Sequence, residues 1–362
     1  MSRTAVTNVR VFDGTGLTEP RTVVLDGAVI GDDPAGAETV DGSGRVLLPG
    51  LIDAHIHLHG RESLEQLARY GVTTGLDMAT FSADLLASLR HQPGLTDIRS
   101  AGVPAIGPAG MHARIPGMPA EAVVTDPGQA GAFVAARVAA GSDYLKIVLE
   151  APGGGGPELP AARALTDVAH DAGLLVVAHA TSAGAYTMAL DAGVDVVTHA
   201  PLGAPISADD VARARIVAPT LIMMKGVSTT VGQPQLYDGA KASVTALYRA
   251  GVPILAGTDA NNEPGVPAEV AHGESLHDEL ELLVEAGLST VDALRAATVL
   301  PAEHFGLDDR GAIRSGLRAD LVLLDADPLA DITATRAIAR VWCAGVEVKD
   351  PAGRWTRAPR AR

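Results

Sequence analysis

The fold is decided by the stretch Leu48-Pro49-Gly50-Leu51-Ile52-Asp53-Ala54-His55-Ile56-His57-Leu58. This apolar run, interrupted by one carboxylate and two histidines, predicts a buried strand. Side chains two positions apart on a strand project to the same face, so we expect His55 and His57 to lie side by side. Two buried imidazoles need a polar partner, and a metal ion is a common one. On its own the pair is weak evidence, because histidines satisfied within protein cores are common.

Length and composition limit the classes of protein that this chain can form. Its 362 residues suit a (β/α)8 barrel with a smaller appended domain, and 47% of them are hydrophobic, enough for a large core. The net charge of -15 argues against nucleic acid and anionic membranes as partners. We interpret the basic tail as a solvated terminus: Arg354, Arg357, Arg360 and Arg362. Without a secretory or membrane-spanning segment, the chain is expected to be cytoplasmic.

Both chain ends are predicted to build one small β domain. Residues 1–48 contain short apolar strands separated by Asp-Gly pairs, which are typical of hairpin turns. Residues 306–362 return to the same pattern, so we expect the two segments to pair in a β-sandwich. The single cysteine, Cys343, excludes an intrachain disulfide, and its apolar surroundings indicate a core residue rather than a nucleophile.

Residues 49–305 are predicted to form an α/β domain, a (β/α)8 TIM barrel. Apolar segments alternate with Ala-rich helical patterns, and Ala-Gly pairs before several of them indicate helix ends. A doubly wound open sheet is the alternative, but it does not explain the polar residues at the strand ends. The predicted strands are Leu51–His57, Thr73–Asp77, Gly102–Ile106, Asp143–Leu149, Leu174–Ala180, Asp195–Ala200, Ile216–Met223 and Pro253–Asp259.

Polar residues stand near the ends of several predicted strands, where the active site of such a barrel lies. Individually, a histidine could be a core residue, the lysine could extend to the barrel rim and the aspartate could cap a helix. Their joint occurrence at the same end of the barrel is much harder to explain in this way. The residues are His55, His57, Lys146, His179, His199 and Asp259.

The segment Pro49-Gly50-Leu51-Ile52-Asp53-Ala54-His55-Ile56-His57 resembles the opening signature of the amidohydrolase superfamily, and the resemblance extends over essentially the whole chain. Tyr144-Leu145-Lys146-Ile147, Gly257-Thr258-Asp259 and the closing run from Gly311 to Leu321 are also similar to superfamily motifs. Leu276–Leu282 and Val284–Leu288 resemble the imidazolonepropionase-like branch, which includes Xaa-Pro dipeptidases.

The resemblance implies a binuclear metal centre. His55, His57 and Asp259 would bind the buried ion, and His179 and His199 the more exposed one. Lys146 would bridge the two as an N-carboxylated side chain formed with CO₂. The chemistry of lysine agrees, since an ammonium has no lone pair for a metal and burial favours loss of its charge. Zinc is the expected metal, with Mn²⁺, Fe²⁺ and Co²⁺ as alternatives, and the family resemblance suggests a homo-oligomer.

The reaction expected of this centre is hydrolysis of an amide C–N bond by a metal-bridging hydroxide. Asp259 would act as general base and then as general acid. A dipeptide, an N-acyl amino acid or a cyclic amide would be the small-molecule substrate.

Three alternatives to this reaction are a lactonase, a mononuclear deaminase and a non-catalytic scaffold. Deaminases of the superfamily lack the lysine and place a glutamate near the strand-five histidine, whereas His179 is followed here by Ala180-Thr181-Ser182-Ala183. A scaffold should have lost some of the ligands, and this chain retains the whole set.

Substrate contacts are predicted in the loops after the strands, although these residues could equally be ordinary solvated loop residues. Lys225 and the following Ser/Thr-rich run suggest a flexible lid, and Gly153–Gly156 suggest a mobile loop. His59 and His277 are interpreted as supporting rather than reacting residues. The candidates for substrate binding are His112, Arg114, Lys225, Tyr237, Asn261, Asn262 and Glu263.

Overall fold

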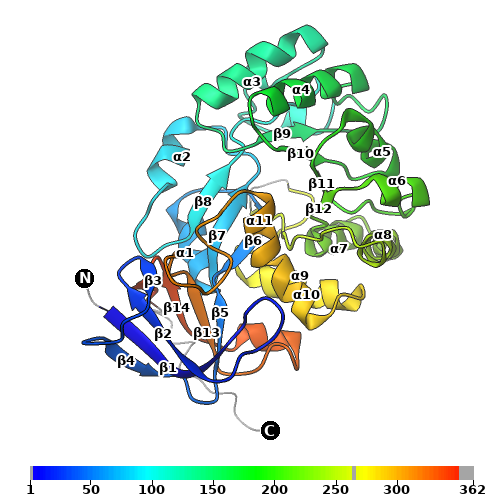
Figure 1. The fold of residues 1–362 in the computed structure, drawn as a ribbon. Coiled ribbons are helices and arrows are strands. Elements are labelled where there is room, and N and C mark those ends of the chain that lie inside the picture. Colours follow the sequence, from blue (N-terminus) through cyan, green and yellow to red (C-terminus); the bar gives the residue numbers. More distant parts are fainter. Residues whose placement is uncertain (1–2, 263–265, 350–362) are drawn as a thin grey trace.

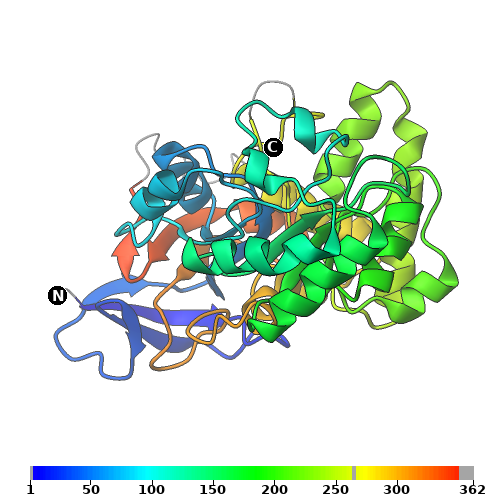
Figure 2. The same cartoon turned by 90° about the horizontal axis from the view of Figure 1, so that it is seen from above.

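The computed structural model describes residues 3–262 and 266–349. The predictions for Glu263 and for the basic tail therefore fall outside the described residues. A sheet built from both chain ends lies beside a larger region of parallel strands and helices (Figure 1). From above, the helices between residues 130 and 250 lie on the side away from that sheet (Figure 2).

The terminal sheet joins strands from both ends of the chain in the order β15-β14-β13-β5-β1-β2-β3, with β4 pairing with β1. The antiparallel pairing of β5 with β13, which places Pro49 opposite Leu321, connects the N-terminal to the C-terminal strands as predicted. Trp342 and Cys343 are buried in this region. The strands are β1 (Arg3–Val11), β2 (Arg21–Asp26), β3 (Val29–Gly31), β4 (Glu38–Asp41), β5 (Val46–Pro49), β13 (Leu321–Leu324), β14 (Ile338–Cys343) and β15 (Val346–Glu347).

The α/β region contains two parallel sheets, β6-β7-β8 and β12-β11-β10-β9. Single parallel bridges join Ala105 to Ile147, Val217 to Ile254 and Ile56 to Ala260, so residues 254–260 lie between β12 and β6. The strands are β6 (Leu51–Ile56), β7 (Val72–Asp77), β8 (Asp97–Ser100), β9 (Leu145–Val148), β10 (Val176–His179), β11 (Val196–Thr198) and β12 (Ile216–Val217).

Helices follow most of these strands, and several end as predicted at a left-handed glycine such as Gly193. In the described part of the chain, no helix has both the length and the apolar character needed to cross a bilayer. The helices are α1 (Arg61–Arg69), α2 (Ala83–Leu89), α3 (Ala130–Ala139), α4 (Leu159–Asp171), α5 (Ala183–Ala192), α6 (Ala208–Arg213), α7 (Leu221–Thr230), α8 (Tyr237–Arg249), α9 (Glu274–Glu285), α10 (Thr290–Ala296) and α11 (Val299–His304), with 3-10 turns η1 (His112–Arg114), η2 (Ala120–Ala122), η3 (Pro127–Gln129), η4 (Pro234–Leu236) and η5 (Ile332–Arg336).

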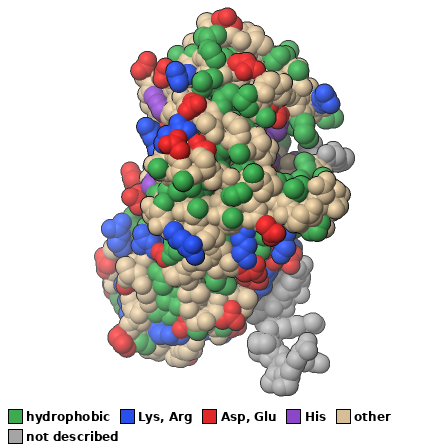
Figure 3. Space-filling view, turned by 90° about the vertical axis from the view of Figure 1, so that its right-hand side faces the viewer, with side chains coloured by type: hydrophobic (Ala, Val, Ile, Leu, Met, Phe, Trp, Pro, Cys, Tyr) green, Lys and Arg blue, Asp and Glu red, His purple; other side chains and the backbone are tan. Residues whose placement is uncertain are grey.

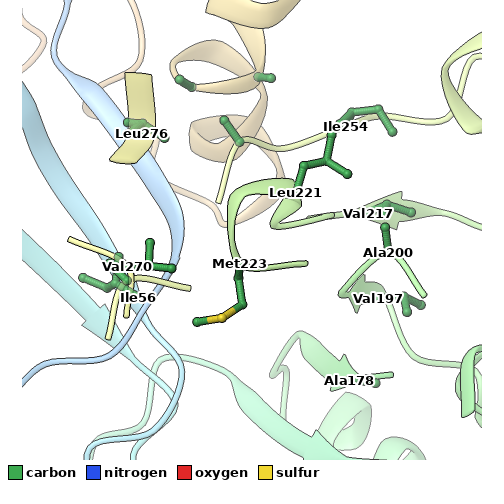
Figure 4. Close-up of a cluster of buried hydrophobic side chains, with 14 of the residues drawn as sticks. Ile56, Ala178, Val197, Ala200, Val217, Leu221, Met223, Ile254, Val270 and Leu276 are labelled. Carbon is green, nitrogen blue, oxygen red and sulfur yellow. The ribbon is translucent and has the colours of Figure 1, made fainter. Parts of the chain in front are cut away.

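Apolar side chains of the parallel strands pack against the surrounding helices. Figure 4 shows Ile56, Val217 and Ala178 from the strands in one buried cluster with Leu221 and Met223 of α7. Alternation along the strand turns every second residue away from this cluster.

In β9 and β10 this alternation separates helix-facing residues from inward-facing ones. Leu145 and Ile147 of β9 belong to the helix-facing cluster, whereas Val177 of β10 belongs to an inner cluster and pairs in register with Lys146. The strands therefore direct Lys146 and His179 toward the interior of the region.

Three of the predicted strands differ from the observed ones. The third sheet strand is β8 (Asp97–Ser100), which lies upstream of the predicted apolar run because its buried charges are paired at long range. The seventh ends at Val217, and the residues predicted to continue it begin α7. The eighth, residues 253–259, makes only single bridges and is assigned no continuous strand.

The two segments predicted to be mobile are ordered in different ways. Lys225 lies within α7, where its carbonyl accepts hydrogen bonds from the hydroxyls of Ser228 and Thr229, so this run is a helix and not a lid. The carbonyl of Gly155 accepts hydrogen bonds from the amides of Ala109 and Gly110, which ties the glycine-rich loop to its neighbour.

Arg310 connects the C-terminal segment to the parallel sheet. Its guanidinium, 3% exposed, donates to the Asp97 carboxylate and the Thr74 hydroxyl, both at 2.9 Å. Burial opposes the charge of Arg310, but the hydrogen bond with Asp309 and the charge of Asp97 raise its pKa, and the pKa of Asp97 is lowered, so the pair remains ionised. Without Arg310, the buried Asp97 would keep Arg99, 3.0 Å away, as its remaining ion-pair partner among the described residues, so its charge would be compensated less well.

Replacing Arg310 by alanine should therefore lower the free energy of unfolding by about 3 kcal/mol, because Asp97 stays buried. Urea denaturation followed by circular dichroism measures the change. The matched control is Arg215→Ala, an exposed arginine 3.6 Å from Asp195, which should have little effect. Equal effects of the two substitutions would contradict this account of Arg310.

Candidate metal centre

The predicted ligands lie at or near the carboxyl ends of the parallel strands. His55 is within β6 and His57 follows it, His179 is the last residue of β10, and His199 follows β11. Three of the predicted ligands form a group whose ligand atoms all lie within 4.8 Å of one another: His55, His199 and Asp259. The structure thus brings together residues far apart in the sequence.

Asp259 is at the centre of the cluster. Its Oδ1 lies 3.0 Å from Nε2 of His57 and 3.4 Å from Nε2 of His55, and its Oδ2 lies 3.8 Å from Nδ1 of His199. The carboxylate is only 13% exposed. One carboxyl group therefore connects the paired histidines of β6 with the histidine after β11.

The remaining predicted histidine joins the cluster through His199. Nε2 of His199 lies 2.9 Å from Nδ1 of His179, and the centroids of the two rings are 4.7 Å apart. The rings of His55 and His199 are 4.8 Å apart. Several imidazole nitrogens consequently face one small volume.

Threonine hydroxyls hold two of these rings in place. Thr198 contacts Nδ1 of His55 at 2.8 Å, and Thr220 contacts Nδ1 of His199 at 2.6 Å. A partner on one ring nitrogen fixes the orientation of the ring and leaves the other nitrogen free to bind. For His55, the free nitrogen is Nε2, which faces Asp259.

Asp53 is hydrogen-bonded to two chain segments that carry the cluster, one at His55 and the other next to Asp259. It is fully buried, accepts hydrogen bonds from the amide and hydroxyl of Thr258, and also accepts the amide of His55. Asp259, which directly follows Thr258, has the uncommon positive φ of 58°. The buried Asp53 carboxylate thereby links the strand that carries His55 to the turn that carries Asp259.

Burial keeps three histidines of this cluster neutral. It lowers the pKa of His55 and of His179 well below the ordinary value and lowers that of His199 to about 3. Burial would raise the pKa of Asp259, but His199 and His57 outweigh it and keep the carboxyl ionised. Neutral imidazoles beside an ionised carboxylate are the donor set that divalent transition metals prefer.

Lys146 is buried, and its Nζ has no hydrogen-bond partner among the described residues. Burial lowers the pKa of Lys146 to about 7, against the opposing influence of Asp259 and Asp77. At neutral pH a substantial share of such an amine is unprotonated and can act as a nucleophile. An unpaired buried polar atom aimed at this cluster fits a residue that binds a further group there.

Sequence reasoning missed Asp77, the last residue of β7. Its buried carboxylate accepts hydrogen bonds from the amide of Leu58 and the hydroxyls of Thr80 and Ser100. Through Leu58 it fixes the chain directly after His57. The available signal was its position at the end of a predicted strand, where every other singled-out residue also stands.

Glu279 was missed as well, because its partners are distant in the sequence. This fully buried residue of α9 accepts the amides of Leu221 and Ile222 and so caps the start of α7. Thr220, which contacts His199, directly precedes this helix. The signal in the sequence was a carboxylate on the apolar side of a helix.

Of the predicted substrate-binding residues discussed next, one lies beside the candidate metal centre and three lie elsewhere. His112 lies at the centre, with its ring 4.7 Å from that of His179. Arg114 and Lys225 are exposed, and in the described part of the chain their side chains have no hydrogen bond or ion pair. The hydroxyl of Tyr237 is buried beneath the α7–α8 region, and burial raises its pKa.

The two histidines interpreted as supporting residues, and a third, can be placed from their contacts. His277 is buried between the hydroxyl of Thr335 and the carbonyl of Tyr70, a structural position as expected. His272 contacts the carbonyl of His57 at 2.7 Å, and His59 lies beside it, with ring centroids 5.8 Å apart. The loop after residue 266 therefore covers one side of the paired histidines.

Parallel strands carrying a histidine, lysine and aspartate cluster at their ends define a class of metal-dependent hydrolases. Comparison with known families gives the particular assignment: the model of the amidohydrolase family matches residues 46–348, and the chain belongs to this family. It is accordingly a hydrolase acting on C–N bonds, from a family that generally uses divalent metals.

Two curated relatives are similar to this chain over different shares of their own length. An uncharacterized protein from Mycobacterium tuberculosis is 30% identical over 354 residues, covering 87% of this chain and 89% of its own. An adenine deaminase from a Methylobacterium species is 29% identical over 371 residues, covering 94% of this chain. The match spans 57% of the deaminase, so that protein is considerably longer.

Solved structures share the fold over almost the whole chain. A Xaa-Pro dipeptidase with bound methionine in the active site has a TM-score of 0.83 at 21% identity, covering 96% of this chain and 100% of its own. Molinate hydrolase has a TM-score of 0.78 at 23% identity, covering 99% and 98%. These neighbours are of the TIM-barrel type.

The buried carboxyl of Glu279 predicts a pH dependence of stability. Burial raises its pKa to about 8 from an ordinary 4.5, so between these values the folded chain holds a proton that the unfolded chain has released. Through Glu279 alone, raising the pH across this window lowers the free energy of unfolding of the metal-free protein, whereas the buried histidines with lowered pKa act in the opposite direction. Urea denaturation of the wild type and of Glu279→Gln isolates the contribution of Glu279, because the slope of the free energy of unfolding against pH should be more positive in the variant.

The control for this experiment is Glu285→Gln on the same helix, where the side chain is 57% exposed. This variant should keep the slope of the wild type. A slope unchanged by Glu279→Gln would assign the pH dependence to other groups.

Proposed function

We propose that this chain is a binuclear metal-dependent amidohydrolase that hydrolyses an amide C–N bond in a small molecule. The observation that carries the proposal is Lys146, a buried amine that has no hydrogen-bond partner among the described residues and is electrostatically coupled to Asp259. Addition of CO₂ to its unprotonated Nζ, with loss of one proton, gives a carbamate anion with two oxygen donors. Such a bridge would connect two ions.

The donor set is consistent with this assignment. We assign His55, His57 and Asp259 to one ion, His179 and His199 to the other, and carboxylated Lys146 to both. When bound, two divalent ions act as Lewis acids and lower the pKa of a shared water. Zinc is the expected metal for this set, with Mn²⁺, Fe²⁺ and Co²⁺ as alternatives.

The protein's own residues would handle the proton. Asp259 is ionised and central, so its carboxylate can take the proton of the attacking water and return it to the leaving nitrogen. Asp53, through Thr258, would keep the carboxylate in position during both transfers. His112, beside His179, is the best placed of the predicted substrate contacts.

The proposal includes the architecture and the partners. We infer that the two parallel sheets and residues 254–260 close a (β/α)8 barrel, and that the terminal sheet wraps as a β-sandwich over Val6, Leu25, Leu47, Leu323 and Trp342.

Acidic and basic side chains are interspersed on the face in Figure 3, which agrees with a small-molecule substrate rather than nucleic acid. A homo-oligomer is expected, and light scattering would measure it.

Lys146→Ala and Asp259→Asn should fail in different ways. The first removes the bridge and should lose metal. The second keeps nitrogen and oxygen donors in place and should retain metal, while kcat falls at least about a hundredfold because the proton acceptor is gone. Metal analysis by mass spectrometry and steady-state kinetics on the same samples separate the two. Lys241→Ala, an exposed lysine, serves as control.

If Lys146→Ala kept two metal ions and normal turnover, the binuclear assignment would be wrong. Substoichiometric metal in the wild type, with no turnover, would favour the scaffold alternative.

A hydrolysis screen with metal-reconstituted protein tests the substrate. Xaa-Pro and Xaa-Arg or Xaa-Lys dipeptides, N-acyl amino acids and cyclic amides should include the substrate, with products detected by mass spectrometry. Lactones test the esterase-like alternative. Adenine belongs in the panel because of the similarity to adenine deaminases. Ammonia release from adenine without cleavage of any amide would replace the proposed reaction by deamination.

A further inference from the structure

Two glycine-rich loops interlock beside the candidate metal centre. One follows β8 and contains Gly107 and Gly110, and the other follows β9 and contains Gly155. A Cβ added at Gly107 would lie 2.1 Å from the carbonyl oxygen of Gly155, so no side chain fits there. The amides of Ala109 and Gly110 both donate to that same carbonyl, at 3.2 and 3.0 Å. The loops are thus in direct backbone contact.

Glu150, at the start of the second loop, reaches across to the first. Its Oε1 accepts the amide of Met111 at 3.2 Å and lies 3.7 Å from Nδ1 of His112, longer than a hydrogen bond. A Cβ at Gly110 would come within 2.8 Å of the same oxygen. The absence of a side chain at Gly110 leaves the space that this carboxylate occupies.

The Glu150 contact has a direct consequence at the centre. The ring of His112 is edge-on to His179, with centroids 4.7 Å apart. The pKa of the Glu150 carboxyl is lowered chiefly by His112, with the Met111 amide adding to the effect, so it is an anion at neutral pH. The ring of His112 therefore lies beside both the Glu150 carboxylate and the ring of His179.

We propose that Glu150 is a positioning residue for substrate binding, which holds His112 in a fixed orientation over His179 at the mouth of the metal centre. This inference rests on the proposed function, because it makes the second loop part of the substrate site. Glu150 itself touches no substrate and acts through His112.

A double-mutant cycle tests the route of action. Glu150→Gln keeps an oxygen for the Met111 amide but removes the charge facing His112. In the wild-type background it should raise KM about tenfold, with kcat and metal content nearly unchanged. In the His112→Ala background the same substitution should change KM less than about twofold. The control is Glu158→Gln, an exposed glutamate of the same loop.

A second measurement does not depend on turnover. In protein with isotope-labelled histidine, the ring resonances of His112, assigned by their loss in His112→Ala, should shift or broaden in Glu150→Gln and stay unchanged in Glu158→Gln. Unchanged His112 resonances in Glu150→Gln would overturn the proposal. An equal rise of KM in both backgrounds would overturn it too, since Glu150 would then act without His112.

The two proposals can fail separately. A wild-type protein that loads metal but turns over no compound in the screen defeats the proposed function, and the resonances alone then decide whether Glu150 orients His112. An active wild type with additive effects of Glu150→Gln and His112→Ala defeats only the inference about Glu150.

Discussion

The contact of Asp259 with His55 in β6 and with His57 directly after it is the constraint on which the rest of the α/β region depends. A carboxylate, an amine and four imidazoles are placed in one buried volume, where an unpaired charge is costly. Burial lowers the pKa of Lys146 and of three imidazoles, those of His55, His179 and His199, while Asp259 keeps its charge. Such an assembly is stabilised by cations, which is the physical basis of the proposed binuclear centre.

Around this cluster, several reactive groups are held by residues that do not face the reaction. Asp53 connects His55 to Thr258, and Thr198 and Thr220 fix the outer nitrogens of two rings. Behind Thr220, Glu279 caps the helix that follows. These supports come from elements distant in sequence, so the positions of the ligands are determined by tertiary contacts rather than by local turns. The arrangement is pre-organised before any ligand binds.

The sequence predicted that the candidate ligands gather at strand ends, because HxH, Lys146 and Asp259 are chemically unusual inside apolar strands. It failed where long-range pairing overrides local pattern. Asp97 made β8 look unlike a buried strand, since its partner Arg310 lies 213 residues away. Similarly, the apolar residues after Val217 suggested a longer strand, and only the cap from Glu279 explains why they form a helix. Glu150 could not be found from sequence, because its role depends on two loops meeting.

The pairing of β5 with β13 also determines when the terminal sheet can be completed during translation. β5 leads directly into the strand that carries His55 and His57, yet one of its two neighbours is synthesised about three-quarters of a chain length later. Until residues 321–324 leave the ribosome, β5 has only β1 beside it. The base of the metal-binding strand is therefore completed only near the end of translation, and a chain stopped before β13 lacks that neighbour.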